Sequence, residues 1–217
     1  MKIAEIGGTG NEGSGLARRW ARAGHTLFIG SRDAERAKKC ADELHVGGAA
    51  FGGENGWAAA QAELVVVAVP YAAHGDTFRA LRGIVDNKVV LDITVPLQPP
   101  KVSQVHLPPG QSAALEAQEI LGPGARVAAA LHHISYAHLA DPNFAIDCDV
   151  LVCSNDDAAR ATVIALVADL GLRGLDSGVL RNAIALESLT SVLIHLNKKY
   201  KSAGTGIRIT GLPPKAP

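Results

Sequence analysis

Residues 2–36 read KIAEIGGTGNEGSGLARRWARAGHTLFIGSRDAER, and this stretch decides the fold. A short apolar strand, Ile3–Ile6, leads into Gly8-Thr9-Gly10-Asn11-Glu12-Gly13, which has the spacing G-x-G-x-x-G. A helical pattern follows, and a second apolar strand ends at Gly30-Ser31-Arg32. Placed between a strand and a helix, this glycine motif indicates a dinucleotide-binding loop.

Each glycine of the motif has an expected task. We expect Gly8 to let the chain turn sharply, Gly10 to let a pyrophosphate approach the backbone, and Gly13 to let the helix pack close to the sheet. The helix that starts near Gly13 offers unpaired N–H groups and the positive end of its dipole to phosphate. The alternative interpretation is a tight turn that binds no ligand.

The end of the second strand distinguishes the two common nicotinamide dinucleotides. An NAD site usually has Asp or Glu there, which accepts hydrogen bonds from the ribose 2′-hydroxyl. Here Ser31 can donate a hydrogen bond, and Arg32 can stack on adenine or pair with a 2′-phosphate. Arg36, one helical turn further, adds a second cation. We therefore predict NADP(H), although Ser31 and Asp33 are also suited to capping the next helix.

Composition excludes several classes of protein. The 217 residues carry 21 basic and 21 acidic side chains, so no nucleic-acid-binding or membrane-binding surface is indicated. Apolar residues make up 47% of the chain and aromatic residues 4%, so we expect packing by Ala, Leu, Val and Ile. No apolar run reaches the roughly 18 residues that a membrane span needs.

The three cysteines, Cys40, Cys148 and Cys153, form no C-x-x-C pair. Their odd number favours reduced thiols in a cytoplasmic protein. We expect no zinc site, because no cluster of Cys and His has the spacing of metal ligands. A strand begins at the second residue, so we also expect no signal peptide.

Strand and helix patterns alternate along the chain, which predicts an α/β fold with a doubly wound, mostly parallel sheet. The predicted strands are Lys2–Ile6, Thr26–Gly30, Leu64–Val69, Lys88–Asp92, Arg126–Leu131 and Val150–Cys153, with a weak one near Ala49–Phe51. The predicted helices are Gly13–Ala23, Ala34–Leu44, Ala72–Leu81, Ala113–Ile120, Asp157–Leu170 and a long one over 181–201.

The chain divides by pattern into a dinucleotide-binding domain over 1–178, a C-terminal segment over 179–212 and a tail over 213–217. The segment 96–110 is rich in proline and is therefore predicted as a loop. The long C-terminal helix has a broad apolar face, which suits either dimer packing or a lid over the nicotinamide. A short extended piece is expected at 207–209.

Ligands of this fold bind at the carboxyl ends of the strands. Val69-Pro70 and Val95-Pro96 follow two such ends and suit the walls of a nicotinamide pocket. His132 follows a third end, where a histidine can donate a proton, hold a carbonyl or simply cap and pack. The chain shows no Ser-His-Asp arrangement and no Tyr-x-x-x-Lys, so the chemistry is expected to be direct hydride transfer.

Several segments resemble the NADPH-dependent reductases of coenzyme F420, also called F420:NADP oxidoreductases. They span nearly the whole chain in order: GGTGNEGSGLA at 7–17, GHTLFIGSR at 24–32, AALHHIS at 129–135, DCDVLVCSNDDAAR at 147–160, LRNAIALESLTSVLIHLNKKY at 180–200 and GIRITGL at 206–212. The last two are the most specific, because generic Rossmann domains do not carry them.

The resemblance implies a homodimer that passes a hydride between NADP(H) and an 8-hydroxy-5-deazaflavin. The implied cofactor-binding residues are Gly8, Thr9, Gly10, Asn11 and Glu12 for the phosphates, Ser31, Arg32 and Arg36 for the 2′-phosphate, and Val69, Pro70, Ala73, His74 and Val95 for the nicotinamide. The implied deazaflavin pocket consists of Thr9, His132, Ile134, Ser188 and Thr190. The two helix hydroxyls in this set also suit bonds to the carbonyl four residues earlier.

Some residues depart from the family pattern. Glu12 stands where the family has an apolar or neutral residue, and we expect its carboxylate to point to solvent, away from the pyrophosphate. His133 and Tyr136 are bulky beside the deazaflavin. The basic residues near the C-terminal end suit either the anionic tail of the deazaflavin or a solvated helix end; they are Lys198, Lys199, Lys201 and Arg208.

Two other functions stay open from the sequence. One is an NADPH-dependent reductase of a different small acceptor, such as an imine, a pterin, a flavin or a ferric chelate. The other is a protein that senses NADP(H) without turnover.

Overall fold

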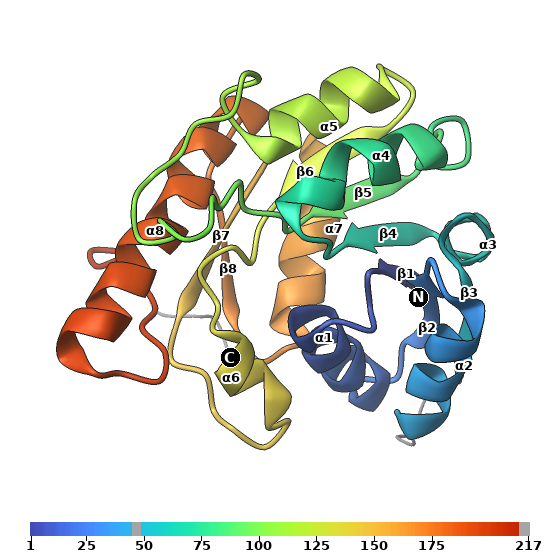
Figure 1. Cartoon of the computed structure of the whole chain (residues 1–217), viewed down its shortest axis with the longest axis horizontal. Coiled ribbons are helices and arrows are strands. Elements are labelled where there is room, and N and C mark those ends of the chain that lie inside the picture. The colour runs from blue at the N-terminus through green and yellow to red at the C-terminus, as the bar shows by residue number, and fades with distance from the viewer. Residues whose placement is uncertain (45–48, 213–217) are drawn as a thin grey trace.

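The computed structural model describes residues 1–44 and 49–212. Its centre is one eight-stranded sheet with the order β3-β2-β1-β4-β5-β6-β7-β8 (Figure 1). The strands are β1 Lys2–Ile6, β2 Thr26–Ser31, β3 Ala50–Glu54, β4 Leu64–Val67, β5 Val89–Asp92, β6 Arg126–Ala129, β7 Asp149–Ser154 and β8 Arg173–Asp176. Strands β1 to β6 are parallel, and their carboxyl ends meet at one edge of the sheet, called here the carboxyl edge.

Helices cover both faces of the sheet, as the alternating pattern predicts. They are α1 Asn11–Arg22, α2 Ala34–Glu43, α3 Asn55–Gln61, α4 Tyr71–Leu81, α5 Ala113–Leu121, α6 Tyr136–Ala140, α7 Asp157–Ala168 and α8 Ala183–Tyr200, with a 3-10 turn at Leu180–Asn182. One core lies under α1, α2 and α7, and the other lies under α3, α4, α5 and α8. The predicted doubly wound α/β fold is therefore confirmed.

Successive side chains of β1 and β4 point to opposite faces of the sheet, so each strand contributes residues to both cores. Ile3 and Val66 belong to the first core, whereas Ala4, Val65 and Val67 belong to the second. All five side chains are fully buried. A continuous apolar run such as β4 is what a strand covered on both faces requires.

Four short elements were not predicted: β8, α3, α6 and the 3-10 turn. They are three to seven residues long, too short for a clear periodic pattern. β3 extends to Glu54, beyond the weak prediction at 49–51, through Gly52 and Gly53. A Cβ at Gly52 would lie 2.3 Å from the backbone of Ala37 in α2, so close helix packing requires glycine there.

β7 reverses the direction of the sheet. It runs antiparallel to β6, with Ala128 opposite Ser154, and β8 then runs parallel to β7. The carboxyl ends of β7 and β8 consequently lie at the edge opposite to the carboxyl edge. α8 starts at this opposite edge and returns along the sheet to the carboxyl edge, where Thr190 contacts His132.

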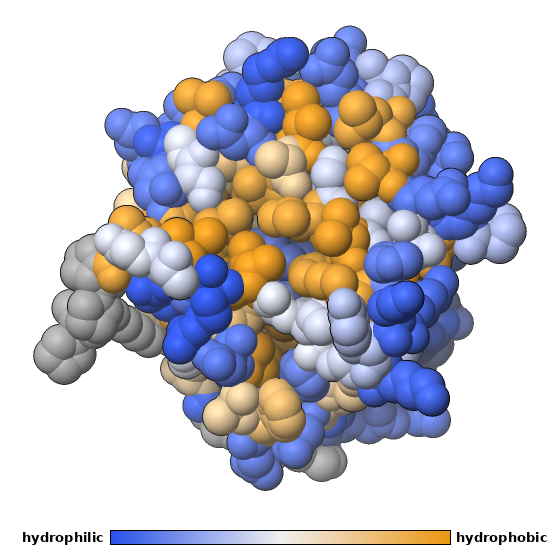
Figure 2. Space-filling view, turned by 90° about the vertical axis from the view of Figure 1, so that its left-hand side faces the viewer, coloured by the Kyte–Doolittle hydropathy of each residue, from blue (hydrophilic) through white to orange (hydrophobic). Residues whose placement is uncertain are grey.

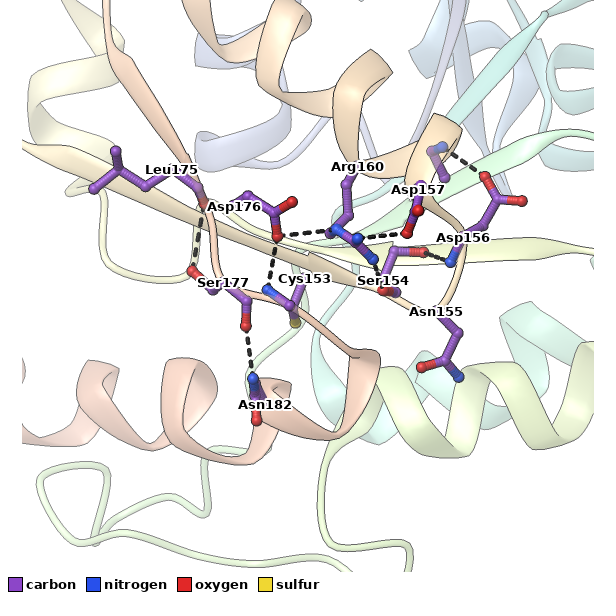
Figure 3. Close-up of polar contacts among 12 residues, drawn as sticks. Cys153, Ser154, Asn155, Asp156, Asp157, Arg160, Leu175, Asp176, Ser177 and Asn182 are labelled. Carbon is purple, nitrogen blue, oxygen red and sulfur yellow. Dashed lines mark hydrogen bonds and ion pairs between the residues drawn. The ribbon is translucent and has the colours of Figure 1, made fainter.

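Polar contacts around Arg160 anchor the start of α8 (Figure 3). Arg160 Nε pairs with Asp176 Oδ1 over 2.9 Å at the end of β8. The same oxygen accepts a hydrogen bond from the Gly178 N–H at 2.8 Å, and Asn182 Nδ2 donates to Ser177 O at 2.6 Å. These contacts fix the turn that aims α8 back across the sheet.

The C-terminal segment is packed on the rest of the chain. Leu180, Ala183 and Leu186 belong to the second core. The predicted extended piece at 207–209 runs beside the start of β7, where Ile207 O accepts from the Asp149 N–H at 2.8 Å. The predicted tail at 213–217 lies outside the described residues. Within the described ranges, no helix combines the length and apolar character of a membrane span.

Candidate cofactor and substrate site

The loop after β1, residues 7–13, is called the phosphate loop. The sharp turn falls on Gly7, which has φ +81°, and not on Gly8 as the sequence predicted. A Cβ at Gly8 would lie 2.8 Å from Glu5 Cγ, so Gly8 serves close packing instead. The turn comes one residue earlier than expected. It falls on Gly7 because a glycine adopts a positive φ at little cost.

α1 begins at Asn11 with Gly10 as its N-cap, two residues before the predicted start. A Cβ at Gly10 would meet only Gly7 O, at 3.3 Å, which leaves the outer side of this backbone open. At Gly13 it would lie 2.9 Å from Gly8 Cα, so Gly13 packs the helix against the loop. The loop therefore fits a pyrophosphate, with open backbone at Gly10 and a helix N-terminus behind it.

Two carboxyl groups lie at this loop: Glu5 is beneath it, and Glu12 belongs to it. Glu5, in β1, is fully buried, and neither of its side-chain oxygens has a hydrogen-bond partner in the described structure. Glu12 is half-buried and does not point freely to solvent, which corrects the sequence expectation. Burial raises the pKa of Glu12 to about 8. Burial, and then the charge of Glu12, raises the pKa of Glu5 well above its usual range.

The end of β2 lies beside the phosphate loop. Gly30 O accepts from the Gly7 N–H at 3.1 Å. Ser31 Oγ accepts from the Asp33 N–H at 3.2 Å, and Asp33 Oδ1 caps α2 through the Arg36 N–H at 3.1 Å. Arg36 Nη2 donates to Thr9 O at 3.2 Å, so this side chain bridges the predicted 2′-phosphate site and the phosphate loop. 

Four of the five predicted nicotinamide-wall residues keep exposed surface after β4 and β5: Val69, Pro70, Ala73 and Val95. His74 does not, because its side chain is 1% exposed and faces the core. Its Nε2 lies 2.8 Å from Asp92 Oδ2. Asp92 Oδ1 in turn accepts from the Thr94 N–H at 3.0 Å, so the buried pair shapes the turn that presents Val95.

His132 follows β6 at the carboxyl edge. The preceding residue, Leu131, is fully buried with φ +67°, a strained backbone for a branched side chain. His132 is 3% exposed, and neither ring nitrogen has a hydrogen-bond partner among the described residues. Burial, with His133 beside it, lowers the pKa of His132 to about 4. The ring is therefore a neutral imidazole with unused hydrogen-bonding capacity.

α8 brings the two predicted hydroxyls to the same edge. Thr190 Oγ1 donates to His132 O at 2.7 Å. Ser188 Oγ donates to Ile184 O at 2.5 Å, which is the bond to the carbonyl four residues earlier that sequence reasoning left open. Ile134 is buried at 6% exposure and lines a cavity of about 160 Å³ behind the segment.

The departures from the family pattern lie apart from one another. His133 is buried, and its Nε2 bonds Asp149 O at 2.9 Å. Tyr136 begins α6 and is 57% exposed. Arg208 pairs with Asp147 Oδ1 at 3.1 Å, and the lysines Lys198, Lys199 and Lys201 are exposed at the end of α8.

Sequence reasoning missed four buried charged residues around the site: Glu5, Asp92, Glu187 and Arg19. Glu187, in α8, accepts from the Ala113 N–H at 2.7 Å and the Ala114 N–H at 3.1 Å, and so caps α5 from another helix. Burial, and then Asp92, raises the pKa of Glu187 to about 8. The available signal was a charged residue among apolar neighbours in a predicted strand or helix.

Arg19 connects α1 to the segment after His132. Its guanidinium donates hydrogen bonds to four backbone carbonyl oxygens in residues 138–144, at 2.6 to 3.4 Å. The residue is 8% exposed. The helix that follows the phosphate loop thus holds the chain that continues from His132.

The sheet order, the glycine-rich loop and the cationic end of β2 define a Rossmann-type protein that binds a nicotinamide dinucleotide. A family model described as NADP oxidoreductase, coenzyme F420-dependent, matches residues 2–96. The F420-dependent NADP reductase of Methanothermobacter thermautotrophicus is 40% identical, over 98% of this chain and 96% of that protein. The chain belongs to the F420-dependent NADP reductase family.

Other relatives agree with this assignment. The F420-dependent NADP reductase of Methanocaldococcus jannaschii is 38% identical, over 98% of this chain and 99% of its own length. The solved structure of a proposed F420-dependent NADP reductase from Arthrobacter sp. FB24 has a TM-score of 0.81 and 29% identity, covering 97% of this chain and 99% of that one. The family resemblance inferred from the sequence is confirmed.

Proposed function

We propose that this protein transfers a hydride between NADP(H) and the deazaflavin coenzyme F420. The observation that carries the proposal is the hydrogen bond from Thr190 to His132 O, because it joins the family-specific helix α8 to the carboxyl edge of a dinucleotide-binding sheet. The names of the relatives with 38% and 40% identity support both substrates.

The NADP(H) half of the site is proposed along β1, β2, β4 and β5. The phosphate loop offers open backbone at Gly10 and the N-terminus of α1 to the pyrophosphate. Arg32 and Arg36 are exposed near Ser31, where they supply charge for a 2′-phosphate. Val69, Pro70, Ala73 and Val95 are the proposed nicotinamide contacts, and His74 supports them from the core.

The deazaflavin half is proposed between the phosphate loop, the segment 132–134 and α8. Thr9, His132, Ile134, Ser188 and Thr190 are the proposed residues. His132 suits a hydrogen bond to a neutral or anionic ring substituent, because its nitrogens are unpartnered and its pKa is lowered by burial. We place the functional division at residue 178, with 179–212 supplying the acceptor side.

When bound, the nicotinamide and the deazaflavin supply the hydride donor and acceptor carbons. The chain's own task is positioning: the strained turn at Leu131 fixes His132, and the bond to Thr190 holds α8 against it. Apolar residues such as Ile134 keep water from the transfer path. Hydride transfer needs no general base, which agrees with a neutral His132.

Mixing the purified protein with NADPH and oxidised F420 tests this function. We expect rapid loss of the deazaflavin's visible absorbance with NADPH and much slower loss with NADH, and no loss when riboflavin replaces F420. Binding of NADPH without bleaching of F420 would redirect the search to imines, pterins, flavins or ferric chelates. A tight NADPH complex that reduces none of these acceptors would favour an NADP(H) sensor.

We further propose that the protein is a homodimer formed through α8. Figure 2 shows apolar side chains gathered on the side of the molecule where α8 lies. Val192 is 46% exposed, and Leu189 and Leu196 on the same helix are partly exposed. We expect light scattering to give a dimer mass that Val192→Glu halves and Lys198→Glu does not. A monomer mass for the unaltered protein would contradict the proposal.

Finally, we propose that the protein works in the cytoplasm. Cys40, Cys148 and Cys153 are all free thiols, and Cys148 and Cys153 are buried. Free thiols persist in a reducing compartment. Fractionation of the source cells tests this location.

A further inference from the structure

The position of Glu5 is unusual for a carboxyl group. It is in the central strand β1, is 0% exposed, and has no hydrogen-bond partner for either oxygen among the described residues. Its Oε1 lies 3.1 Å from where a Cβ of Gly13 would be, directly beneath the phosphate loop. An ionised carboxylate in such surroundings is strongly disfavoured, so Glu5 is held in its neutral form.

Glu12 extends this feature to the loop itself. It stands beside Gly13 in the first turn of α1, half-buried, and makes no side-chain hydrogen bond in the described structure. Its charge acts on Glu5, and burial raises its own pKa to about 8. Two carboxyl groups therefore lie at the loop that is proposed to receive a pyrophosphate: Glu5 beneath it and Glu12 within it.

The other titratable groups facing this pair come from α1 and α2. Cys40, in α2, donates a hydrogen bond from its Sγ to Gly8 O over 3.6 Å. The charges that act on the pKa of its thiol are those of Glu43, Arg18, Arg36 and Glu5. Burial, the largest cause, raises the pKa of the Cys40 thiol, so Cys40 is neutral wherever Glu12 titrates.

We propose that Glu5 and Glu12 form a proton-binding pair beneath the phosphate loop, and that NADP(H) binding takes up a proton from solvent at this pair. The proposal rests on the NADP(H) half of the proposed function and not on the identity of the acceptor. It gives the two carboxyl groups a role that a merely structural position does not provide.

The negative charge of the pyrophosphate determines that a proton is taken up and not released. The pyrophosphate is an anion, and bringing it to the loop disfavours a second anion below, so the pKa of Glu12 rises further in the complex. Near pH 8 about half of the free protein has Glu12 ionised, and this fraction must gain a proton on binding. At pH 6.5 Glu12 is already neutral, so the uptake there is close to zero. Above pH 8 the Kd for NADP⁺ should rise up to about tenfold per pH unit.

Calorimetric titration of NADP⁺ into the full chain tests the linkage. Measuring the binding enthalpy at pH 8 in buffers of different ionisation enthalpy gives the number of protons taken up. We expect about half a proton per site for the unaltered protein. The 2′-phosphate contributes nothing at this pH, because a phosphate monoester ionises near about pH 6.

Three variants separate the groups. Glu12→Gln should abolish the uptake and make Kd independent of pH between 7.5 and 8.5, where the 2′-phosphate is fully ionised, since the amide mimics the neutral carboxyl. Glu43→Gln and Cys40→Ser are matched controls on α2 and should keep the uptake. Glu5→Gln, checked for folding by thermal unfolding, should keep the uptake, because Glu5 is neutral in the free protein and the amide mimics its neutral form.

Binding of NADP⁺ without proton uptake would overturn the linkage, as would an unchanged uptake in Glu12→Gln. A failure of NADP⁺ to bind at any pH would instead overturn the proposed function, and with it the basis of this inference. The two failures are thus distinguishable in one set of titrations.

Discussion

Thr190 Oγ1 donates a hydrogen bond to the backbone oxygen of His132 over 2.7 Å, although the two residues are 58 positions apart. The contact joins the middle of α8 to a strained turn at the carboxyl edge. It connects the proposed acceptor helix directly to the carboxyl edge of the sheet. Its removal should therefore act on acceptor binding and leave NADP(H) binding unaltered.

Thr190→Val keeps the shape of the side chain and removes the donor. We expect the KM for F420 to rise roughly fivefold, because a buried carbonyl loses a hydrogen bond that contributes about 1 kcal/mol. The Kd for NADPH should stay the same. Thr162→Val is the control, since Thr162 donates to Ala158 O within α7, away from the carboxyl edge. Equal kinetic constants for both variants would place Thr190 outside the acceptor site.

Ser188→Ala tests the neighbouring hydroxyl. Its donor bond to Ile184 O is local to α8, so the free energy of unfolding should change by less than about 0.5 kcal/mol. In the unaltered protein, Ser188 Oγ keeps its lone pairs free to accept a hydrogen bond from F420. We therefore expect Ser188→Ala to lower F420 turnover several-fold and to leave the affinity for NADPH unchanged. Steady-state kinetics together with urea unfolding measure both effects. An unaltered rate would make Ser188 a structural residue only.

The proposed 2′-phosphate site predicts that its substitutions weaken the binding of NADPH more than the binding of NADH. Arg32→Ala and Arg36→Ala should each weaken NADPH binding roughly tenfold or more, because each removes a charged hydrogen-bond donor. NADH affinity should change much less for Arg32→Ala. Arg36→Ala should also weaken NADH slightly, since Arg36 holds the phosphate loop at Thr9 O. Lys39→Ala, an exposed cation on α2, is the control. Equal losses for NADPH and NADH in Arg32→Ala would exclude a 2′-phosphate contact.

His132 predicts a specific pH dependence of stability. Its folded pKa of about 4 lies below the unfolded value, so the unfolded chain binds the proton first as pH falls. The stabilisation is complete above about pH 6.5 and is lost progressively toward pH 4. Relative to His132→Gln, the unaltered protein should lose about 2 kcal/mol between pH 7.5 and pH 5.

Arg19→Met tests the connection between α1 and residues 138–144. Methionine keeps the buried volume but leaves four backbone carbonyl oxygens without their donor, which should cost about 3 kcal/mol of unfolding free energy. Arg22→Met on the same helix is the control, because Arg22 makes one exposed bond to Asn143. Comparable denaturation midpoints for the two variants would show that the four bonds contribute little.

The sequence was sufficient where local pattern and long-range packing agree. The apolar run of β4 and the glycine-rich loop after β1 each specify backbone and burial together, so both elements were predicted, although β4 ends at Val67 and the sharp turn falls on Gly7. The cap of α2 by Asp33 was predicted for the same reason, because Asp at an N-cap satisfies a nearby N–H without help from distant residues.

Prediction failed where a residue's partner lies far along the chain. His74 looks like a wall of the nicotinamide pocket in the sequence, but Asp92 holds it in the core. The capping of α5 by Glu187 spans 74 residues. No periodicity encodes such pairs. The residues proposed to contact NADP(H) and F420 stay predictions for the binding experiments above.

The length of α8 sets the distance between its first contacts, at one edge of the sheet, and Thr190, at the other edge. Contacts near Asn182 set its start, Glu187 fixes its rotation against α5, and Thr190 marks the point where it meets His132. Inserting one residue between Glu187 and Thr190 would turn the following residues by about 100° and advance them about 1.5 Å. Thr190 would then leave His132 while Glu187 stayed in place. In this family member, the number of residues in α8 therefore cannot change without moving the acceptor site.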